Sequence, residues 1–95
     1  MRDYELVVIL NPEITDDSVP ASIERLQGSI TGRGGEVVEV NHWGRRRLAY
    51  PIKHRLEGNY VVTQLRLDPS QVNGLENGLR ISEEVLRHLI VKAGD

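Results

Sequence analysis

The chain has 95 residues, no cysteine and a formal net charge of −2 at neutral pH. A chain of this length builds one domain around one modest hydrophobic core. Without cysteine, disulfide bonds, thiolate zinc sites and iron–sulfur clusters are excluded. No apolar run approaches the roughly 18 residues of a transmembrane helix, and the short N-terminal run that carries Glu5 makes a poor signal peptide. We therefore expect a single domain over residues 1–95, outside the membrane and in the cytoplasm.

The first two predicted elements are a strand over Tyr4–Leu10 and a helix that begins near Asp17. Within the strand, Leu6–Leu10 is a continuous apolar run, which is typical of a strand covered on both faces. Apolar residues then recur at helical spacing, at Val19, Ile23, Leu26 and Ile30. Pro20 fits the first turn of this helix, and the glycines of residues 32–35 end it.

The second strand is predicted over Glu36–Val40 and can stay extended into the arginines of residues 45–47. Gly44 lies inside this extended run and indicates a bulge or a bend. Pro51 has no N–H to donate to a neighbouring strand. The sequence therefore places this strand at an edge of the sheet.

The third strand is predicted over Asn59–Leu67, after a loop at Lys53–Gly58. Alternate residues of this strand are apolar, which indicates one face turned to a core. Together with the second strand it forms a long hairpin. We expect this hairpin to pair Arg46–Ile52 with the segment that begins at Asn59.

A second helix and a last strand complete the chain. Asp68 is a suitable N-cap residue, Pro69 suits the first helical position, and Val72, Leu75 and Leu79 form an apolar face. Residues 81–84 are predicted as the exit loop and Val85–Val91 as the last strand. The order strand, helix, strand, strand, helix, strand is the split βαβ pattern of ferredoxin-like α+β domains. It predicts a four-stranded antiparallel sheet of order 4-1-3-2 with both helices on one face.

This arrangement leaves the other face of the sheet open. Val7 and Ile9 of the first strand are then expected to point outward, beside Tyr60 and Val62 of the third. Scattered apolar residues are ordinary on protein surfaces, but a contiguous patch marks a partner surface. We favour a partner surface because four such residues would be adjacent.

No recognisable catalytic or metal-binding set occurs in the sequence. His42, His54 and His88 lack the spacing of zinc ligands. The glycines of residues 32–35 lack the Lys-Ser/Thr pair and the following helix of a phosphate loop. We expect that the chain is not an enzyme and that it binds no cofactor or metal.

Positive charge is concentrated in one segment. Five of the 12 Lys and Arg residues lie between Arg45 and Arg55, and no Asp or Glu occurs from Asn41 through Leu56. Such a segment predicts contact with RNA phosphates or with a protein partner. Charges on an edge strand also discourage aggregation between sheets, and the two roles are compatible.

Two further features bear on binding. Trp43 and Tyr50 flank the arginines, and such rings stack on bases, contact a partner or only brace the hairpin; the sequence leaves these alternatives open. Because the first and last strands should be antiparallel neighbours, Arg2 and Lys92 are expected to meet at one end of the sheet.

Residues 44–52, Gly-Arg-Arg-Arg-Leu-Ala-Tyr-Pro-Ile, resemble the signature of the bacterial small-subunit ribosomal protein six family. Further similar segments are Met1–Glu5, Asn11-Pro12, Gly58–Tyr60, Leu79–Ile81 and Leu86–His88. The resemblance spans essentially the whole chain. It implies a ferredoxin-like fold, location in the ribosome, binding to small-subunit ribosomal RNA and pairing with ribosomal protein eighteen of that subunit.

Charge, topology and this resemblance together give the expected contact residues. The expected RNA-binding residues are Arg2, Arg45, Arg87, His88 and Lys92. The expected partner-binding residues are Arg46, Arg47, Leu48, Tyr50 and Tyr60. We expect a monomer when the protein is free. A generic RNA-recognition module would place an aromatic-rich motif on the third strand, and an acylphosphatase-like enzyme would carry a glycine-rich anion loop with an arginine; both are absent from the sequence.

Overall fold

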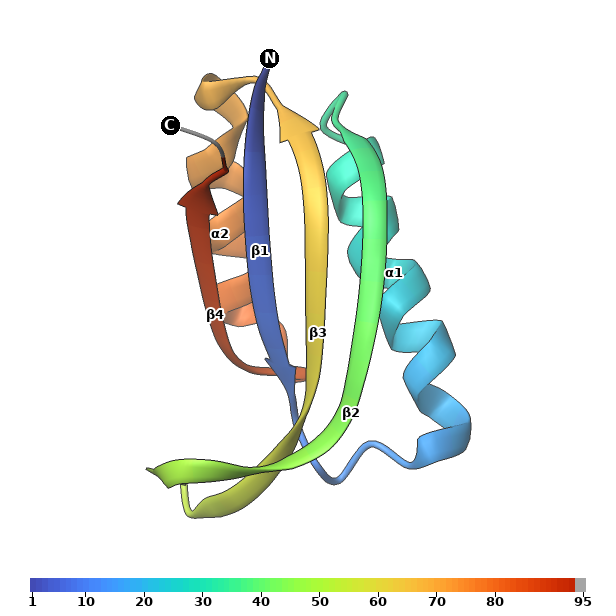
Figure 1. Cartoon of the computed structure of the whole chain (residues 1–95), viewed down its shortest axis with the longest axis vertical. Coiled ribbons are helices and arrows are strands. Elements are labelled where there is room, and N and C mark those ends of the chain that lie inside the picture. The colour runs from blue at the N-terminus through green and yellow to red at the C-terminus, as the bar shows by residue number, and fades with distance from the viewer. Residues whose placement is uncertain (94–95) are drawn as a thin grey trace.

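The computed structural model describes residues 1–93 and contains the predicted elements in the predicted order (Figure 1). The helices are α1 (Val19–Thr31) and α2 (Val72–Ile81), each preceded by a single 3₁₀ turn, Asp16–Ser18 and Pro69–Gln71. The strands are β1 (Arg2–Leu10), β2 (Glu36–Ile52), β3 (Arg55–Leu67) and β4 (Val85–Lys92). The sheet is antiparallel with the order β2-β3-β1-β4, which confirms the ferredoxin-like prediction. Neither helix of the described part is long and apolar enough to cross a membrane.

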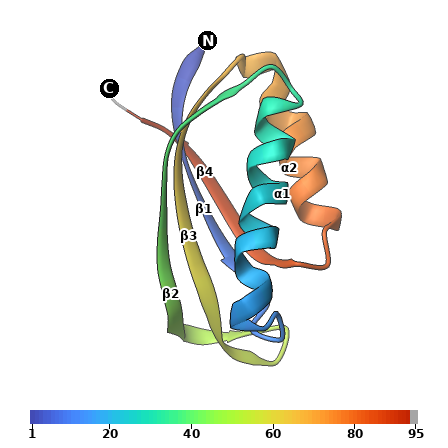
Figure 2. The same ribbon diagram turned by 90° about the vertical axis from the view of Figure 1, so that its right-hand side faces the viewer.

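Both helices lie on one face of the sheet, and the other face is open (Figure 2). The main core fills the space between the helices and the sheet. The buried residues that β1 contributes to this core are Tyr4, Leu6, Val8 and Leu10, and the helices contribute Val19, Leu26, Ile30, Leu75 and Leu79. The inward face of β1 was therefore predicted correctly. Full burial of an aliphatic side chain of this size contributes about 1.5–3 kcal/mol. These contacts stabilise two helices that are too short to be stable by themselves in water.

The hairpin formed by β2 and β3 extends beyond the end of β1. We call residues 45–58 the hairpin arm; it bends across the lower end of β1 (Figure 1). Leu48 of the arm is buried against Ile9 and Leu86, in a second small cluster apart from the main core. Ile9 was predicted to be exposed on the open face, but only 8% of its surface is accessible, because Leu48 and Leu86 pack against it. Val62, which was also predicted to be exposed, is buried as well.

β2 is an edge strand, as predicted, because it pairs only with β3 in the described part of the chain. Its register shifts between His42 and Gly44, where Gly44 has a φ of 89°. This confirms the bulge expected at Gly44, since only glycine adopts such a φ without strain. The register shifts again between Arg47 and Ile52, and Pro51 lies in that irregular segment.

The turn of the hairpin arm is shorter than predicted. Residues 53–58 were expected to form a loop, but Ile52 pairs with Arg55, so that only Lys53 and His54 form the turn. The pairing partners shift accordingly. Arg46 pairs with Gly58, whereas it was predicted to pair with the segment that begins at Asn59. This two-residue turn was not predicted because a tight turn of this kind normally contains Asn-Gly or a similar pair. Here Lys53 and His54 adopt positive φ angles of 49° and 65°.

Differences at α2 are small. Ile81 was predicted in the exit loop but is the last residue of the helix. Asp68 caps the 3₁₀ turn before α2, where its carboxylate accepts a hydrogen bond of 2.9 Å from the Ser70 N–H. This bond to the backbone stabilises the charged form and lowers the pKa of Asp68 below its ordinary value.

The first prediction concerns Gly58, where β3 passes close to β1. A Cβ at this position would lie 2.5 Å from Ile9 Cγ2 and 3.1 Å from the Leu10 carbonyl oxygen. We expect Gly58→Ala to destabilise the protein by about 1–3 kcal/mol through overpacking. Gly28 in α1 is the matched control, since no atom lies within 4 Å of its added Cβ. Gly28→Ala should stabilise by about 0.5–1 kcal/mol, as judged from urea midpoints; equal midpoints for the two variants would contradict the close approach.

The second prediction concerns the turn. A non-glycine residue with positive φ costs about 1–2 kcal/mol, and both turn residues adopt it. Replacing Lys53 by Asn and His54 by Gly should therefore stabilise the protein by about 0.5–1 kcal/mol. Urea denaturation of the double variant measures this gain. An unchanged or lowered midpoint would show that the turn is not strained.

Candidate RNA and partner interface

The hairpin arm carries five cations, and acidic neighbours neutralise two of them. Arg45 Nη1 lies 2.9 Å from Glu57 Oε1, and its Nη2 lies 3.8 Å from Asp16 Oδ1. Arg55 forms an ion pair with Glu13. Because Asp16 and Glu13 lie just before α1, these pairs connect the arm to the helix layer. Exposed pairs of this kind contribute little to stability, at most about 1 kcal/mol each.

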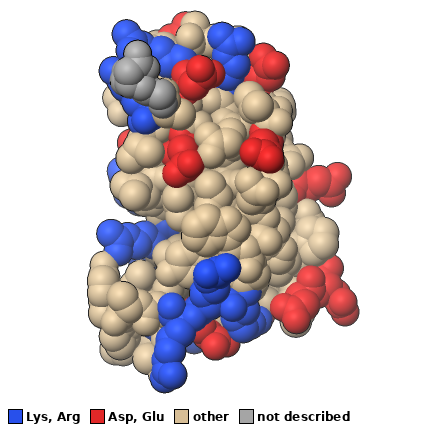
Figure 3. Space-filling view, in the orientation of Figure 1, with Lys and Arg blue, Asp and Glu red and all other residues tan. Residues whose placement is uncertain are grey.

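The other three cations of the arm are Arg46, Arg47 and Lys53. All three are exposed, and none forms an ion pair within the described residues. Lys and Arg side chains gather over the lower part of the open face, while the middle of that face is largely uncharged (Figure 3). The arm is therefore a local source of positive potential on a chain of net charge −2.

Trp43 lies beside this cationic surface. Its ring is stacked with that of Tyr60, with centroids 6.3 Å apart and planes 10° from parallel. The guanidinium of Arg46 lies 5.1 Å from the Trp43 ring centroid. Trp43 is nevertheless 52% exposed. The ring is thus braced by the hairpin and also available for contact, which combines the alternatives that the sequence left open.

Tyr50 and Arg87 form a second aromatic–cation pair. Arg87 Nη1 donates a hydrogen bond to the Tyr50 hydroxyl, and its guanidinium lies 6.0 Å from the ring centroid. Arg87 lies opposite Ile9, so this contact links β4 to the hairpin arm. Tyr50 remains exposed, whereas Leu48 of the same segment is buried. Leu48 therefore anchors the arm.

The five expected RNA-binding residues do not form one patch. Lys92 lies opposite Tyr4, so it meets Arg2 at the end of the sheet away from the hairpin arm, as expected from the antiparallel pairing. Arg45 and Arg87 lie near the arm instead. His88 points to the opposite face from Arg87, since its Nε2 lies 3.4 Å from Glu76 Oε1 of α2 and only 15% of its side chain is exposed.

The sequence analysis missed two exposed apolar residues on the open face of β4. Leu89 and Val91 are 55% and 45% exposed. Leu89 lies opposite Val7 in the β1–β4 pairing, on the face away from the helices. The signal was present, because residues 87, 89 and 91 share one side of a strand. It was overlooked because only the first and third strands were considered for the open face.

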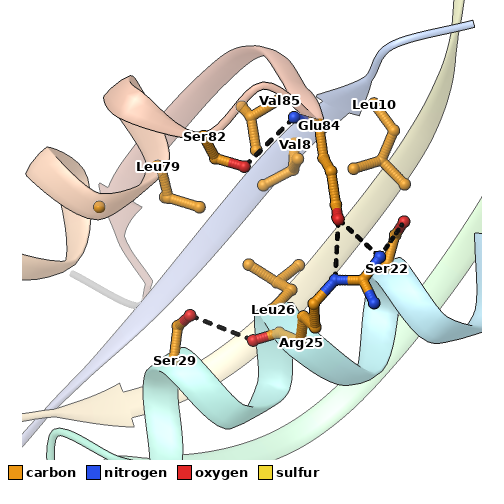
Figure 4. A pocket seen from close by; sticks show the side chains of 11 residues that line it. Val8, Leu10, Ser22, Arg25, Leu26, Ser29, Leu79, Ser82, Glu84 and Val85 are labelled. Carbon is orange, nitrogen blue, oxygen red and sulfur yellow. Dashed lines mark hydrogen bonds and ion pairs between the residues drawn. The ribbon is translucent and has the colours of Figure 1, made fainter. Parts of the chain in front are cut away.

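A small cavity of about 220 Å³ lies on the helix side, between α1, α2 and the beginning of β4 (Figure 4). Its apolar floor is formed by Val8, Leu10, Leu26, Leu79 and Val85. The polar groups at its rim bind one another: Arg25 donates to Glu84 at 2.8 Å and to Ser22 at 3.3 Å. The Ser82 hydroxyl accepts from the Glu84 N–H at 3.3 Å. Because these polar groups bind one another, the rim presents no free polar groups that converge for catalysis. No group of three potential metal ligands occurs in residues 1–93.

Comparison with known proteins identifies the family. The sequence model of the ribosomal protein S6 family matches residues 3–92. Small ribosomal subunit protein bS6 of Dehalococcoides mccartyi (strain CBDB1) is 43% identical over 91 residues, which cover 96% of this chain and 84% of that protein. The bS6 protein of Desulforudis audaxviator (strain MP104C) is 42% identical over 92 residues, with coverages of 97% and 98%. The crystal structure of 30S ribosomal protein S6 from Thermotoga maritima superposes with a TM-score of 0.90, at 32% identity and coverages of 96% and 86%.

These similarities confirm the resemblance carried by residues 44–52 and by the rest of the chain. They also confirm that the protein is not an enzyme, since the family is one of structural ribosomal proteins. The acylphosphatase-like alternative is thereby excluded. The chain belongs to the ribosomal protein S6 family.

Proposed function

We propose that the protein is a structural constituent of the small ribosomal subunit that binds small-subunit ribosomal RNA together with ribosomal protein eighteen. Its relatives are named as small ribosomal subunit proteins over nearly the whole of this chain, which acts as one binding domain. As a ribosomal protein it is located in the cytoplasm, in the ribosome. The observation that carries the proposal is the hairpin arm, where unneutralised arginines lie beside exposed aromatic rings.

The proposed RNA contacts lie at two ends of the domain. Arg2 and Lys92 are exposed at one end, and Arg45 and Arg87 lie at the other. The long dimension of the domain is 35 Å, so one RNA reaches both ends only by following the length of the domain. His88 points to the helix side, where its Nε2 lies 3.4 Å from Glu76 Oε1, so any RNA contact of this residue would be made from that face. Arg45 and Arg87 already hold internal partners, which weakens each contact with phosphate.

The proposed protein partner binds at the hairpin arm and the adjoining open face. Arg46, Arg47, Tyr50 and Tyr60 supply contacts, and buried Leu48 holds the arm in position. Arginine and tyrosine are enriched at the energetically important positions of protein interfaces. A partner seated here would add its own basic surface and order the joint RNA site before RNA binds.

The third prediction separates binding from folding at the arm. Arg46 and Arg47 are exposed and form no ion pair in the described chain, so their double replacement by Glu should change the free energy of unfolding by no more than about 0.5 kcal/mol. Incorporation of the variant into small subunits should fall strongly, because cations are replaced by anions facing RNA and partner. Reconstitution followed by sedimentation measures incorporation.

The matched control for this variant is the double replacement of Arg33 and Arg80 by Glu. Both residues are exposed on the helix side, where they contact Gln71 and Asn77, and their replacement produces the same change in net charge. The control should incorporate normally. A large loss of stability with normal incorporation of the arm variant would reverse the roles that we assign to Arg46 and Arg47.

The fourth prediction concerns joint binding. With about three to five phosphate contacts, the affinity of this protein alone for RNA should fall by only about 2 to 4.5 log units per log unit of salt. Labelled small-subunit RNA should bind weakly to this protein alone and much more tightly after an equimolar addition of ribosomal protein eighteen, with a steeper salt dependence. Tight, sequence-specific binding by this protein alone, at both of two salt concentrations, would refute the joint-binding proposal.

A further inference from the structure

Trp43 is the one tryptophan of the chain, and its position is unusual for so large an apolar ring. The residue is 52% exposed, and it lies on β2 just before this strand enters the cationic hairpin arm. The bulge between His42 and Gly44 interrupts the alternation of β2 and sets the ring beside Tyr60. The backbone thus departs from regular pairing at the point where Trp43 is presented on the surface. Bulges commonly redirect a side chain next to a functional site.

The ring is held firmly from within the molecule. Tyr60 is nearly parallel to Trp43, and Tyr60 itself packs against the buried cluster of Ile9, Leu48 and Leu86. Tyr60 therefore supports the Trp43 ring and connects it to buried side chains. A platform that is already ordered loses little conformational entropy when a ligand stacks on it.

The surroundings of the platform are cationic. Arg46 lies over the Trp43 ring, and no Asp or Glu occurs from Asn41 through Leu56. A flat aromatic ring next to a cation, within a segment of residues 41–56 that lacks acids, provides one site for a base and one for its phosphate. Proteins that bind single-stranded nucleic acids combine these same two elements.

We infer that Trp43 is a stacking platform for one unpaired RNA base, which takes the place of the Arg46 guanidinium over the ring, while Arg46 moves aside to meet the phosphate of that nucleotide and Tyr60 supports the ring. This inference rests on the proposed function and adds to it the ligand of this ring. Arg46 and Tyr60 then position Trp43 in addition to contacting the protein partner. Paired bases in a duplex cannot reach the ring, so the platform selects an unpaired nucleotide.

The single tryptophan makes the test direct, because the indole fluorescence of the protein reports on Trp43 alone. The protein is titrated at low salt with a short single-stranded oligoadenylate, and separately with an RNA duplex of the same length at equal phosphate concentration. Stacking should quench the emission in the first titration and leave it nearly unchanged in the second. Absence of saturable quenching by the single strand, or equal quenching by both RNAs, would overturn the inference.

Variants then separate stacking from charge. Trp43→Leu should weaken binding of the labelled single strand on the order of tenfold to a hundredfold, and Trp43→Phe, which keeps a ring, should weaken it less. Both should leave the salt dependence unchanged, because no charge is removed. Replacing Arg46, the cation assigned to the phosphate, by Gln should instead reduce that dependence. Urea midpoints verify that each variant is folded, and Trp43→Phe serves if the leucine variant is not.

The occupant of the ring is decided by the same measurements. Unaltered affinity of folded Trp43→Leu or Trp43→Phe for the single strand would overturn the inference. A shift of the emission on addition of ribosomal protein eighteen, without any response to RNA, would assign the ring to a protein interface and would also overturn it. Neither result would affect the proposed function, which is judged separately by incorporation of the Arg46 and Arg47 double variant.

Discussion

The binding surface depends on one small hydrophobic contact, the burial of Leu48 against Ile9 and Leu86. A two-stranded hairpin is at best marginally stable in water by itself, and the hairpin arm extends beyond the end of β1. The contact fixes the arm to the sheet, and the close passage of Gly58 over Ile9 permits the approach. The positions of the arginines and of Tyr50 follow from it, and Tyr60, which supports Trp43, packs against the same cluster. An apolar contact thus determines where a polar surface is presented.

The distribution of charge explains how an acidic chain presents a cationic surface. Arg45 and Arg55 pair with Glu57 and Glu13, so the most heavily charged segment is partly neutralised at its base. The remaining cations of the arm have no such partners in the described part of the chain. Their field acts mainly within about 8–10 Å in physiological salt, so the acids elsewhere do not cancel it. Local arrangement, rather than net charge, governs contact with a polyanion.

Much of the fold could be predicted because local patterns and tertiary packing agree. The apolar run of β1, the helical spacing from Val19 to Ile30 and the alternation of Asn59–Leu67 each indicated an element that the structure contains. Pro51 indicated an edge strand and Gly44 a bulge, because each residue has a backbone property that allows few alternatives. The basic cluster and its aromatic neighbours were likewise visible as a binding segment.

The sequence by itself therefore determined the order and type of the elements, the sheet topology and the segment that carries the candidate site. Only the tertiary structure decided which members of that segment are available. Burial of Leu48, pairing of Arg45 with Glu57 and the stacking of Trp43 on Tyr60 join residues that are distant in the sequence or shifted by a bulge. Periodicity describes one element at a time, whereas these contacts depend on how the bent hairpin arm meets β1 and β4. For the same reason the turn at Lys53 and His54 was missed, since pairing across the arm overrides the local preference of its residues.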